Sequence, residues 1–360
     1  MTTKNLNSRR FKGRGATLNP TSRFEVLDSE AFDDGWDSLA SMRDETGRPQ
    51  TEVRPDRSRS VIATNQSPDI PFDQSINTYR GCEHGCIYCY ARPSHAFLGL
   101  SPGLDFETKL SAKYDAPELL VRELARPTYR CTPIALGANT DPYQPIERKL
   151  TITRKVVDVL ARHDHPLTIV TKSGGVLRDL DLLASMARKD LVAVAVSVTT
   201  LNPELARKME PRAAAPHRRL EAIGELAAAG IPTVVMVAPV IPGLTDHETE
   251  GILEAAAEKG AWRATYTLLR MPHEIKELFR NWLLHHEPMK AERVLSLHRQ
   301  CRGGRLNDPR FGHRMRGEGT YAALIGRRFR LARKRYGLDR EIPELRTDLF
   351  RRPGDQLRLL

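Results

Sequence analysis

The chain contains little cysteine and no long hydrophobic run. Only five of its 360 residues are cysteine, which is too few for a fold built on disulfides. No apolar stretch approaches the ~18 residues that a membrane-spanning helix needs, so we expect no membrane segment. The polar, Arg-rich N-terminus shows no secretory signal, and we therefore expect a reducing cytoplasm. Acidic side chains are outnumbered as well, because 56 Lys and Arg against 45 Asp and Glu give a formal net charge of +11.

Three of the five cysteines lie close together in the sequence. They are Cys82, Cys86 and Cys89, with the spacing C-x3-C-x2-C. Three thiolates from one short loop can hold three corners of a cubic iron–sulfur cluster and leave the fourth iron open. An open iron is where a substrate or a cofactor can bind, so the spacing indicates chemistry more than scaffolding.

A zinc site is the main alternative for these cysteines. Structural zinc takes four closed ligands, usually from two C-x2-C pairs, and Cys86 with Cys89 forms one such pair. The fourth ligand would be His84 or the distant Cys131, and neither falls at a familiar spacing. The pattern therefore favours the cluster, with His84 as a neighbouring or surface group and with Cys131 and Cys301 as buried thiols.

The cysteine motif resembles the signature of the radical S-adenosylmethionine (SAM) enzymes, which includes an aromatic residue before the last cysteine, here Tyr88. Residues 79–92 and 137–147 are similar to the branch of that superfamily related to spore photoproduct lyase, often labelled DNA repair photolyase-like. Residues 171–173 and 197–200 are similar to it too. The resemblance covers about residues 70–300, and within this branch the chain looks like a member of an uncharacterised bacterial subfamily.

This resemblance implies a specific activity. The three cysteines would bind a [4Fe-4S] cluster that cleaves SAM reductively to a 5′-deoxyadenosyl radical, which abstracts hydrogen from a substrate. The electron would come from an external donor such as flavodoxin or ferredoxin. In the lyase a cysteine returns a hydrogen atom to the product, but its position here falls at or beside Ala138, seven residues after Cys131. The hydrogen-donor role is therefore not carried over.

The resemblance also implies SAM-binding residues. We expect Tyr88 to lie against the adenine, Ser197 to bind the ribose hydroxyls, and Asn139 and Thr140 to meet the methionine amino group or carboxylate. The alternative for Tyr88 is a core aromatic. The backbone from Ile241 to Gly243 would border the adenine, because glycine allows a close approach.

Two cations are further candidates for the SAM carboxylate. Lys172 follows an apolar segment, so its ammonium needs a partner, which is either that carboxylate or an internal acid. Arg212 could bind the same carboxylate or pair with Glu210.

Three tyrosines are candidate catalytic residues. Tyr79, Tyr90 and Tyr143 lie in or near the motifs, and a phenol that faces the substrate can relay a hydrogen atom. The alternative for each is packing at the mouth of the barrel.

Apolar segments alternate with helical patterns along the middle of the chain. The strand-like segments are 75–80, 133–137, 167–171, 191–199, 233–239 and 264–269. Such alternation predicts an α/β fold with a parallel sheet, and six units suggest a partial (β/α)6 barrel of the radical SAM type, open on one side. Each motif named above follows a strand, as expected for functional groups at the carboxyl ends of barrel strands.

We expect this core at residues 70–300, between two unlike flanks. Residues 1–60 are predicted to be mostly disordered or irregular, with disorder over 1–20. Residues 301–360 are predicted to form a basic helical extension, since they hold sixteen Lys or Arg against seven Asp or Glu. Such a segment can follow a phosphate backbone, or it can be a surface whose arginines pair with acids elsewhere.

Three functions remain open at this point. The first is a radical SAM enzyme that acts on a nucleic acid, and the second is one that acts on a peptide or small metabolite. The third is a non-catalytic metal-binding nucleic-acid module in which the cysteines hold zinc.

Overall fold

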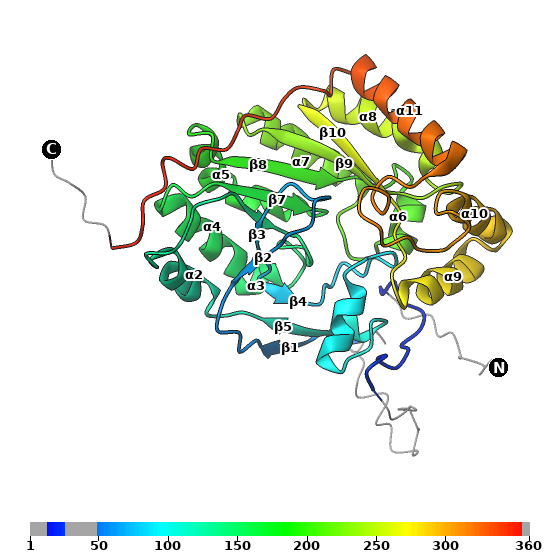
Figure 1. Ribbon diagram of the computed structural model, residues 1–360, viewed down its shortest axis with the longest axis horizontal. Coiled ribbons are helices and arrows are strands. Elements are labelled where there is room, and N and C mark those ends of the chain that lie inside the picture. Colours follow the sequence, from blue (N-terminus) through cyan, green and yellow to red (C-terminus); the bar gives the residue numbers. More distant parts are fainter. Residues whose placement is uncertain (1–12, 26–48, 355–360) are drawn as a thin grey trace.

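The structure is a computed structural model that describes residues 13–25 and 49–354 (Figure 1). Its main sheet has seven strands in the order β10-β9-β8-β7-β6-β3-β2. Their bounds are β2 (Ile62–Thr64), β3 (Gln74–Ile76), β6 (Ile134–Leu136), β7 (Leu167–Thr171), β8 (Val192–Ser197), β9 (Thr233–Val240) and β10 (Arg263–Leu268). From β3 to β10 the neighbouring strands are parallel, and β2 adds an antiparallel edge. The predicted α/β fold with six parallel strands is confirmed.

The first predicted strand differs in one respect. Residues 75–80 divide into β3 and β4 (Tyr79–Arg80), and β4 belongs to a second sheet of order β1-β5-β4. The other members of this sheet are β1 (Glu52–Pro55) and β5 (Lys109–Ala112). The chain therefore changes sheets just before the cysteines, which places the cysteine loop between the two sheets.

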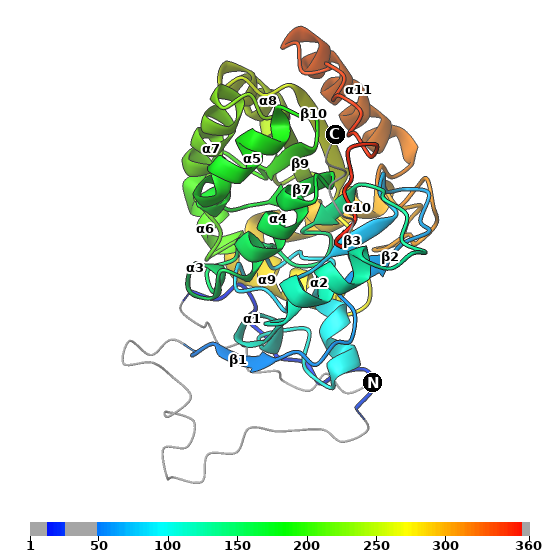
Figure 2. The same ribbon diagram turned by 90° about the vertical axis from the view of Figure 1, so that its left-hand side faces the viewer.

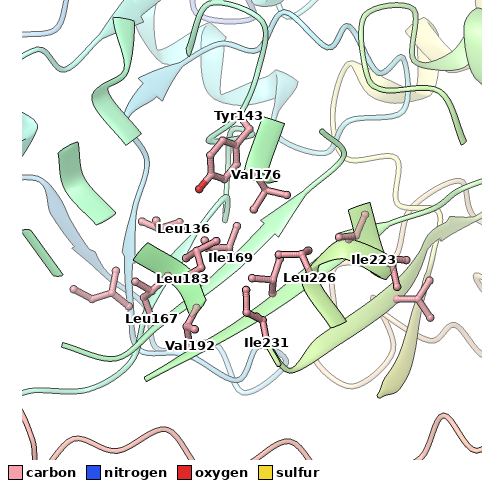
Figure 3. Close-up of a cluster of buried hydrophobic side chains, with 14 of the residues drawn as sticks. Leu136, Tyr143, Leu167, Ile169, Val176, Leu183, Val192, Ile223, Leu226 and Ile231 are labelled. Carbon is pink, nitrogen blue, oxygen red and sulfur yellow. The ribbon is translucent and has the colours of Figure 1, made fainter. Parts of the chain in front are cut away.

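Helices follow most of the parallel strands and cover one face of the main sheet (Figure 2). These helices are α2 (Ala116–Leu124), α4 (Ile152–Arg162), α5 (Leu180–Ala187), α7 (Pro216–Ala228) and α8 (Thr249–Glu258). The strand β8 reads Val-Ala-Val-Ala-Val-Ser and is buried along nearly its whole length, as expected for a parallel strand covered on both faces. Figure 3 shows the resulting core, where Leu136, Ile169 and Val192 of the sheet meet Leu183 and Leu226 of the helices.

Shorter elements lie in the loops that connect the strands and the longer helices. They are η1 (Arg92–Leu98), α1 (Asp105–Thr108), α3 (Glu147–Leu150), η2 (Gly174–Asp179), α6 (Pro203–Met209) and η3 (Asp246–Glu248). After β10 the chain forms α9 (Ile275–His286), α10 (Pro288–Gln300) and α11 (Gly319–Arg335). No helix in the described ranges combines the length and the apolar character needed to cross a bilayer.

The sheet order leaves β10 and β2 as edges, and the loop between α10 and α11 links these two sides. On the β10 side, Leu268 donates its N–H to the Met315 carbonyl at 2.9 Å. On the other side, Asp69 from the β2–β3 hairpin accepts the Gly312 N–H at 2.7 Å and pairs with Arg314 at 2.5 Å. The open side of the partial barrel is therefore bridged by ionic and backbone contacts.

In the described part of the C-terminal extension, up to residue 354, α11 is the one helix. Gly337 follows that helix, and Pro343 and Pro353 disfavour another one, so the chain continues in extended form. It runs past the amino ends of the strands, where Arg346 and Arg351 donate their backbone N–H groups to the carbonyls of Asp190 and His163 at 3.0 and 2.9 Å (Figure 1). Within the described residues, the prediction of a helical extension over 301–360 is thus correct for 319–335 and wrong for 301–318 and 336–354, while 355–360 lie outside the described residues.

The disorder predicted for residues 1–20 is wrong where the structure describes them. Ala16 and Leu18 are 0 and 5% exposed, and they pack beside the cysteine loop. Residues 1–12 and 26–48 lie outside the described residues. The burial of this segment depends on partners distant in the sequence, so its local composition gives no sign of it.

Arg302 is the residue that we expect to stabilise the bridging loop most. It is 2% exposed, and its guanidinium donates to the carbonyls of Leu269, Arg314 and His313 at 2.6, 2.8 and 3.0 Å. Arg302→Met should lower the free energy of unfolding by about 2–3 kcal/mol, because buried carbonyls lose charged donors. Urea unfolding would measure this decrease. Arg305→Ala removes an exposed arginine nearby and should change the free energy of unfolding by less than about 0.5 kcal/mol.

Candidate active site

The three clustered cysteines lie on a tight loop that follows β4. Cys82 and Cys86 are 6 and 7% exposed, and Cys89 is half-buried. Gly81 and Gly85 have φ angles of +78° and +70°, and a Cβ at Gly81 would lie 2.9 Å from the Phe106 carbonyl oxygen. The loop thus requires glycine at these positions for both conformation and space.

A buried ion pair fastens this loop to α1. Arg92 is fully buried and pairs with Glu107 at 2.5 Å. Its guanidinium also donates to the carbonyls of Gly85 and Cys86 at 3.1 and 2.9 Å, and to that of Gly103 at 2.8 Å. One side chain therefore holds the backbone between the first two cysteines in place.

The N-terminal segment 13–20 covers the outer side of the same loop. The Glu107 carboxylate accepts the N–H groups of Gly15 and Ala16 as well, at 3.0 and 2.8 Å. A Cβ at Gly15 would overlap the carbonyl oxygen of Gly85. We call residues 13–20 the N-terminal strap, and its fit to the cysteine loop was not foreseen from the sequence.

The surroundings of the three thiols favour binding to a positively charged metal group over a free thiol state. Burial raises the pKa of Cys82, and the neighbouring Asp141 carboxylate raises it further. Burial likewise raises the pKa of Cys86 and of Cys89. Thiolates here therefore need a positive charge that the loop itself does not supply.

Lys172 reaches the cysteines from the end of β7. Its ammonium donates to Ser197 Oγ at 2.5 Å and to the Ala238 carbonyl at 2.9 Å, and it lies 3.9 Å from the Glu210 carboxylate. Burial lowers the pKa of Lys172 to about 8, although the thiolate charge of Cys86 opposes that shift. The predicted need for a partner is met within the protein by Ser197, Ala238 and, more distantly, Glu210.

Glu210 is a functional residue that sequence reasoning did not single out. It is 2% exposed and accepts hydrogen bonds from the Tyr88 hydroxyl and from Thr199 Oγ1, the latter at 2.8 Å. Arg219, 1% exposed, forms the ion pair that balances its charge. This group fixes the Tyr88 ring, over which the Lys172 ammonium lies 5.7 Å from the centroid. No local motif marks Glu210, because its partners come from separate segments of the chain.

The Asn139-Thr140-Asp141 motif follows β6 and binds mainly to protein groups. Asn77 Oδ1 accepts the N–H groups of Asn139 and Thr140 at 2.8 and 3.2 Å, and the Thr140 hydroxyl donates to the Tyr79 carbonyl. The Asp141 carboxylate accepts the Lys172 N–H at 2.7 Å and lies 3.3 Å from His84 Nδ1. The contact with His84 lowers the pKa of Asp141, against the effect of burial. Asp141 thus links the β6 loop, the β7 loop and the cysteine loop.

Two of the predicted SAM-binding positions have different neighbours from those expected. Arg212 pairs with Glu83 at 2.8 Å, so the predicted alternative of a pair with Glu210 is wrong. The space that Gly243 leaves is used by α10, since a Cβ there would lie 2.8 Å from Leu297 Cδ1. The Ile241 N–H donates to Thr245 within the same loop, at 3.0 Å.

The three candidate catalytic tyrosines lie in different environments. Tyr79 is 1% exposed in the core and its hydroxyl donates to Glu147, while Tyr143 is 3% exposed and packs beside Val176 (Figure 3). Both rings thus lie inward, Tyr143 also lines a cavity with His84 and Arg212, and a role of these two tyrosines toward a substrate stays a prediction. Tyr90 is 48% exposed, and its hydroxyl donates to the Ala138 carbonyl.

Comparison with known families shows to which family this chain belongs. The family model of the radical SAM superfamily matches residues 76–256, which span the cysteine loop and the strands from β6 to β9. The chain belongs to the radical SAM superfamily. It is accordingly a radical SAM enzyme, and the alternative of a non-catalytic zinc module is set aside.

Two relatives of this radical SAM enzyme have names that state no function. One is the uncharacterised protein Rv2578c of Mycobacterium tuberculosis, 39% identical over 243 residues that make up 66% of this chain and 72% of that protein. Another is the uncharacterised protein MJ0683 of Methanocaldococcus jannaschii, 28% identical over 173 residues, or 48% of this chain and 62% of that protein. They support the family and leave the substrate open.

Solved structures confirm the fold of the branch. A mutant of spore photoproduct lyase with bound AdoMet and dinucleoside spore photoproduct matches with a TM-score of 0.58 and 16% identity, over 88% of this chain and 86% of that chain. The complex of spore photoproduct lyase with the dinucleoside alone matches with a TM-score of 0.57 at the same identity and coverage. The enzyme thus shares the spore photoproduct lyase fold, including regions beyond the family match.

The N-terminal strap provides a first test of the site. Gly15→Val should displace the strap, because its side chain would overlap Gly85, and such overpacking costs about 1–3 kcal/mol. Trypsin should then cleave after Arg14 roughly five- to hundredfold faster, as followed by mass spectrometry.

Gly13→Asn is the matched control for this test. A Cβ at Gly13 meets nothing within 4 Å, and Asn tolerates its φ of +76°. Equal cleavage rates for both variants would contradict the close fit of strap and loop.

Proposed function

We propose that Cys82, Cys86 and Cys89 bind three irons of a [4Fe-4S] cluster, that SAM binds the fourth, and that the enzyme abstracts hydrogen from an organic substrate. The observation that carries the proposal is the set of three immobilised thiols beside the Lys172 ammonium. Arg92 and Glu107 hold the loop, and burial favours a metal-bound state of the thiols. Cluster and SAM, when bound, supply the one-electron reduction and the carbon-centred radical.

Residues at the ends of β7 and β8 would orient the cofactor. The Lys172 ammonium is 16% exposed and can bind the SAM carboxylate while it balances the negative charge of the thiolates. The Ser197 hydroxyl, which lies between Lys172 and the Ala238 carbonyl, is the candidate for the ribose. Tyr88 is held by Glu210 in a fixed orientation, as an adenine contact requires.

The remaining predicted cofactor contacts are weaker candidates. Asn139 and Thr140 already use their backbone donors on Asn77, so the Asn139 side chain is the group left for the SAM methionine moiety. Arg212 would have to leave Glu83 to reach a carboxylate. Ile241 and Gly243 could border the adenine through carbonyl groups, since their N–H groups are used within the loop.

A nucleic acid is the substrate class that we favour. The solved lyase of the same fold holds a dinucleoside photoproduct, and Tyr90 with the Arg270 guanidinium 5.6 Å above its ring gives an aromatic and cationic surface near the cysteine loop. A peptide or small metabolite is the alternative. The electron would come from flavodoxin or ferredoxin in a reducing compartment such as the cytoplasm.

The lyase reaction itself is not part of this proposal. Ala138 stands where the resemblance places the hydrogen-donating cysteine, and an alanine has no transferable hydrogen atom of that kind. Cys131 precedes β6, whereas the cysteine loop faces the residues that follow it. Cys131 is therefore at the wrong end of the strand to replace the missing donor.

The ligand assignment predicts the behaviour of cysteine variants. Cys82→Ala, Cys86→Ala and Cys89→Ala should each lower the release of 5′-deoxyadenosine from SAM under dithionite by at least about 100-fold, because removal of one ligand prevents cluster assembly. Anaerobic protein should be brown and contain about four irons per chain.

Cys131→Ala is the matched control and should retain both iron and SAM cleavage. If Cys131→Ala abolished cleavage while the protein remained folded, the ligand assignment would be wrong. An EPR spectrum of the reduced wild type that lacks a [4Fe-4S] signal would refute the proposal as a whole.

A further inference from the structure

A cavity of about 440 Å³ lies between β10 and α11, away from the cysteine loop. Its lining consists of Tyr266, Arg316, Gly317, Glu318, Gly319, Ala322, Ala323, Gly326, Phe329, Arg330 and Arg333. None of these residues belongs to the proposed cofactor site. The size falls within the ~300–1,000 Å³ that is usual for pockets of small ligands.

The walls of this cavity combine an aromatic floor with small side chains. The Tyr266 ring is 8% exposed and packs on Phe329 with 4.6 Å between the centroids. A Cβ at Gly326 would lie 2.9 Å from the Tyr266 hydroxyl, so glycine at this position leaves room for the tyrosine side chain. Arg316 lies over the open face of the same ring, with its guanidinium carbon 4.0 Å from the centroid.

The charge of the cavity is positive and not balanced. Some arginines of the C-terminal segment are paired, such as Arg328 with Glu250 at 2.6 Å. Arg316, Arg330 and Arg333 of the cavity have no carboxylate of the described residues within 4.0 Å, and the same holds for Arg327 and Arg335 outside it. Unpaired guanidinium groups that converge on one cavity favour an anion.

The single acid of the lining does not offset these cations. Glu318 pairs with Arg310 at 2.9 Å, and Arg310 also pairs with Asp308 at 2.6 Å, so the lining has one carboxylate against three arginines.

We propose that this cavity binds a phosphate group, which belongs either to a nucleic-acid strand or to a free nucleotide. Arg330 and Arg333 would hold the phosphate through their guanidinium forks, and Tyr266 with Arg316 would provide a flat surface beside it. The arginines of the C-terminal segment thereby fall into two groups. Its paired arginines serve the fold, and those of the cavity bind a ligand. The inference does not depend on the proposed radical chemistry.

The test compares two double variants of the full-length, anaerobically prepared protein. Arg330→Ala/Arg333→Ala removes two cavity cations, and Arg327→Ala/Arg335→Ala removes the same charge from positions of α11 outside the cavity. Fluorescence anisotropy would follow binding of a labelled single-stranded DNA as the KCl concentration is raised. Competition with AMP and with inorganic phosphate distinguishes the two sources of the phosphate.

The cavity variant should weaken binding of the DNA by at least about tenfold at low salt. It should also lower the slope of log K against log [KCl] by about 0.7 for each phosphate that the protein no longer neutralises, while the control variant changes binding by less than a third as much. Binding of AMP alone, abolished in the same variant, would assign the cavity to a free nucleotide and would still support it.

Ala323→Glu provides a second variant, because it places a carboxylate on the exposed rim of the cavity without removing an arginine. It should weaken binding as the cavity variant does, with an unchanged thermal melt. The proposal is overturned if the wild type binds none of the three probes, or if the control variant weakens binding as much as the cavity variant. SAM cleavage measured on the same samples would report separately on the proposed radical chemistry.

Discussion

The buried pair of Arg92 and Glu107 holds the active site together. An ion pair removed from water is costly unless nearly every donor and acceptor is satisfied. Here the guanidinium also binds the carbonyls of Gly85 and Cys86, and the carboxylate binds the N–H groups of the N-terminal strap. The same pair thus fixes the conformation of the cysteine loop and also binds the N-terminal strap to it.

Two buried carboxylates connect the cysteine loop to the loops that follow the strands. Asp141 joins the cysteine loop to the β6 and β7 loops, and Glu210 joins Tyr88 to residues that follow β8. Because each carboxylate binds groups from different segments, the loops cannot move independently. A site that handles a reactive radical needs such fixed geometry, since the nearest hydrogen atom is the one attacked.

The C-terminal segment shows how one compositional feature can have two physical roles. Arg302 and Arg314 hold the loop that bridges the open side of the barrel, and Arg351 attaches the extended tail. Arg330 and Arg333 form no ion pair with the described residues and line a cavity beside an aromatic ring. Net charge alone could not separate these roles, because it does not depend on which arginines have acidic partners.

Local patterns along the chain were enough to predict the superfamily and the parallel strands, because a fixed cysteine spacing carries the first and short apolar runs between helices carry the second. The neighbours of the candidate site residues could be identified only from the tertiary structure. There Tyr79 and Tyr143 lie in the core, Arg212 pairs with Glu83, and Glu210 becomes a central residue. The strap likewise meets the cysteine loop across about seventy residues of chain. Such contacts join segments distant in sequence, and their energies depend on burial and partners that no local pattern contains.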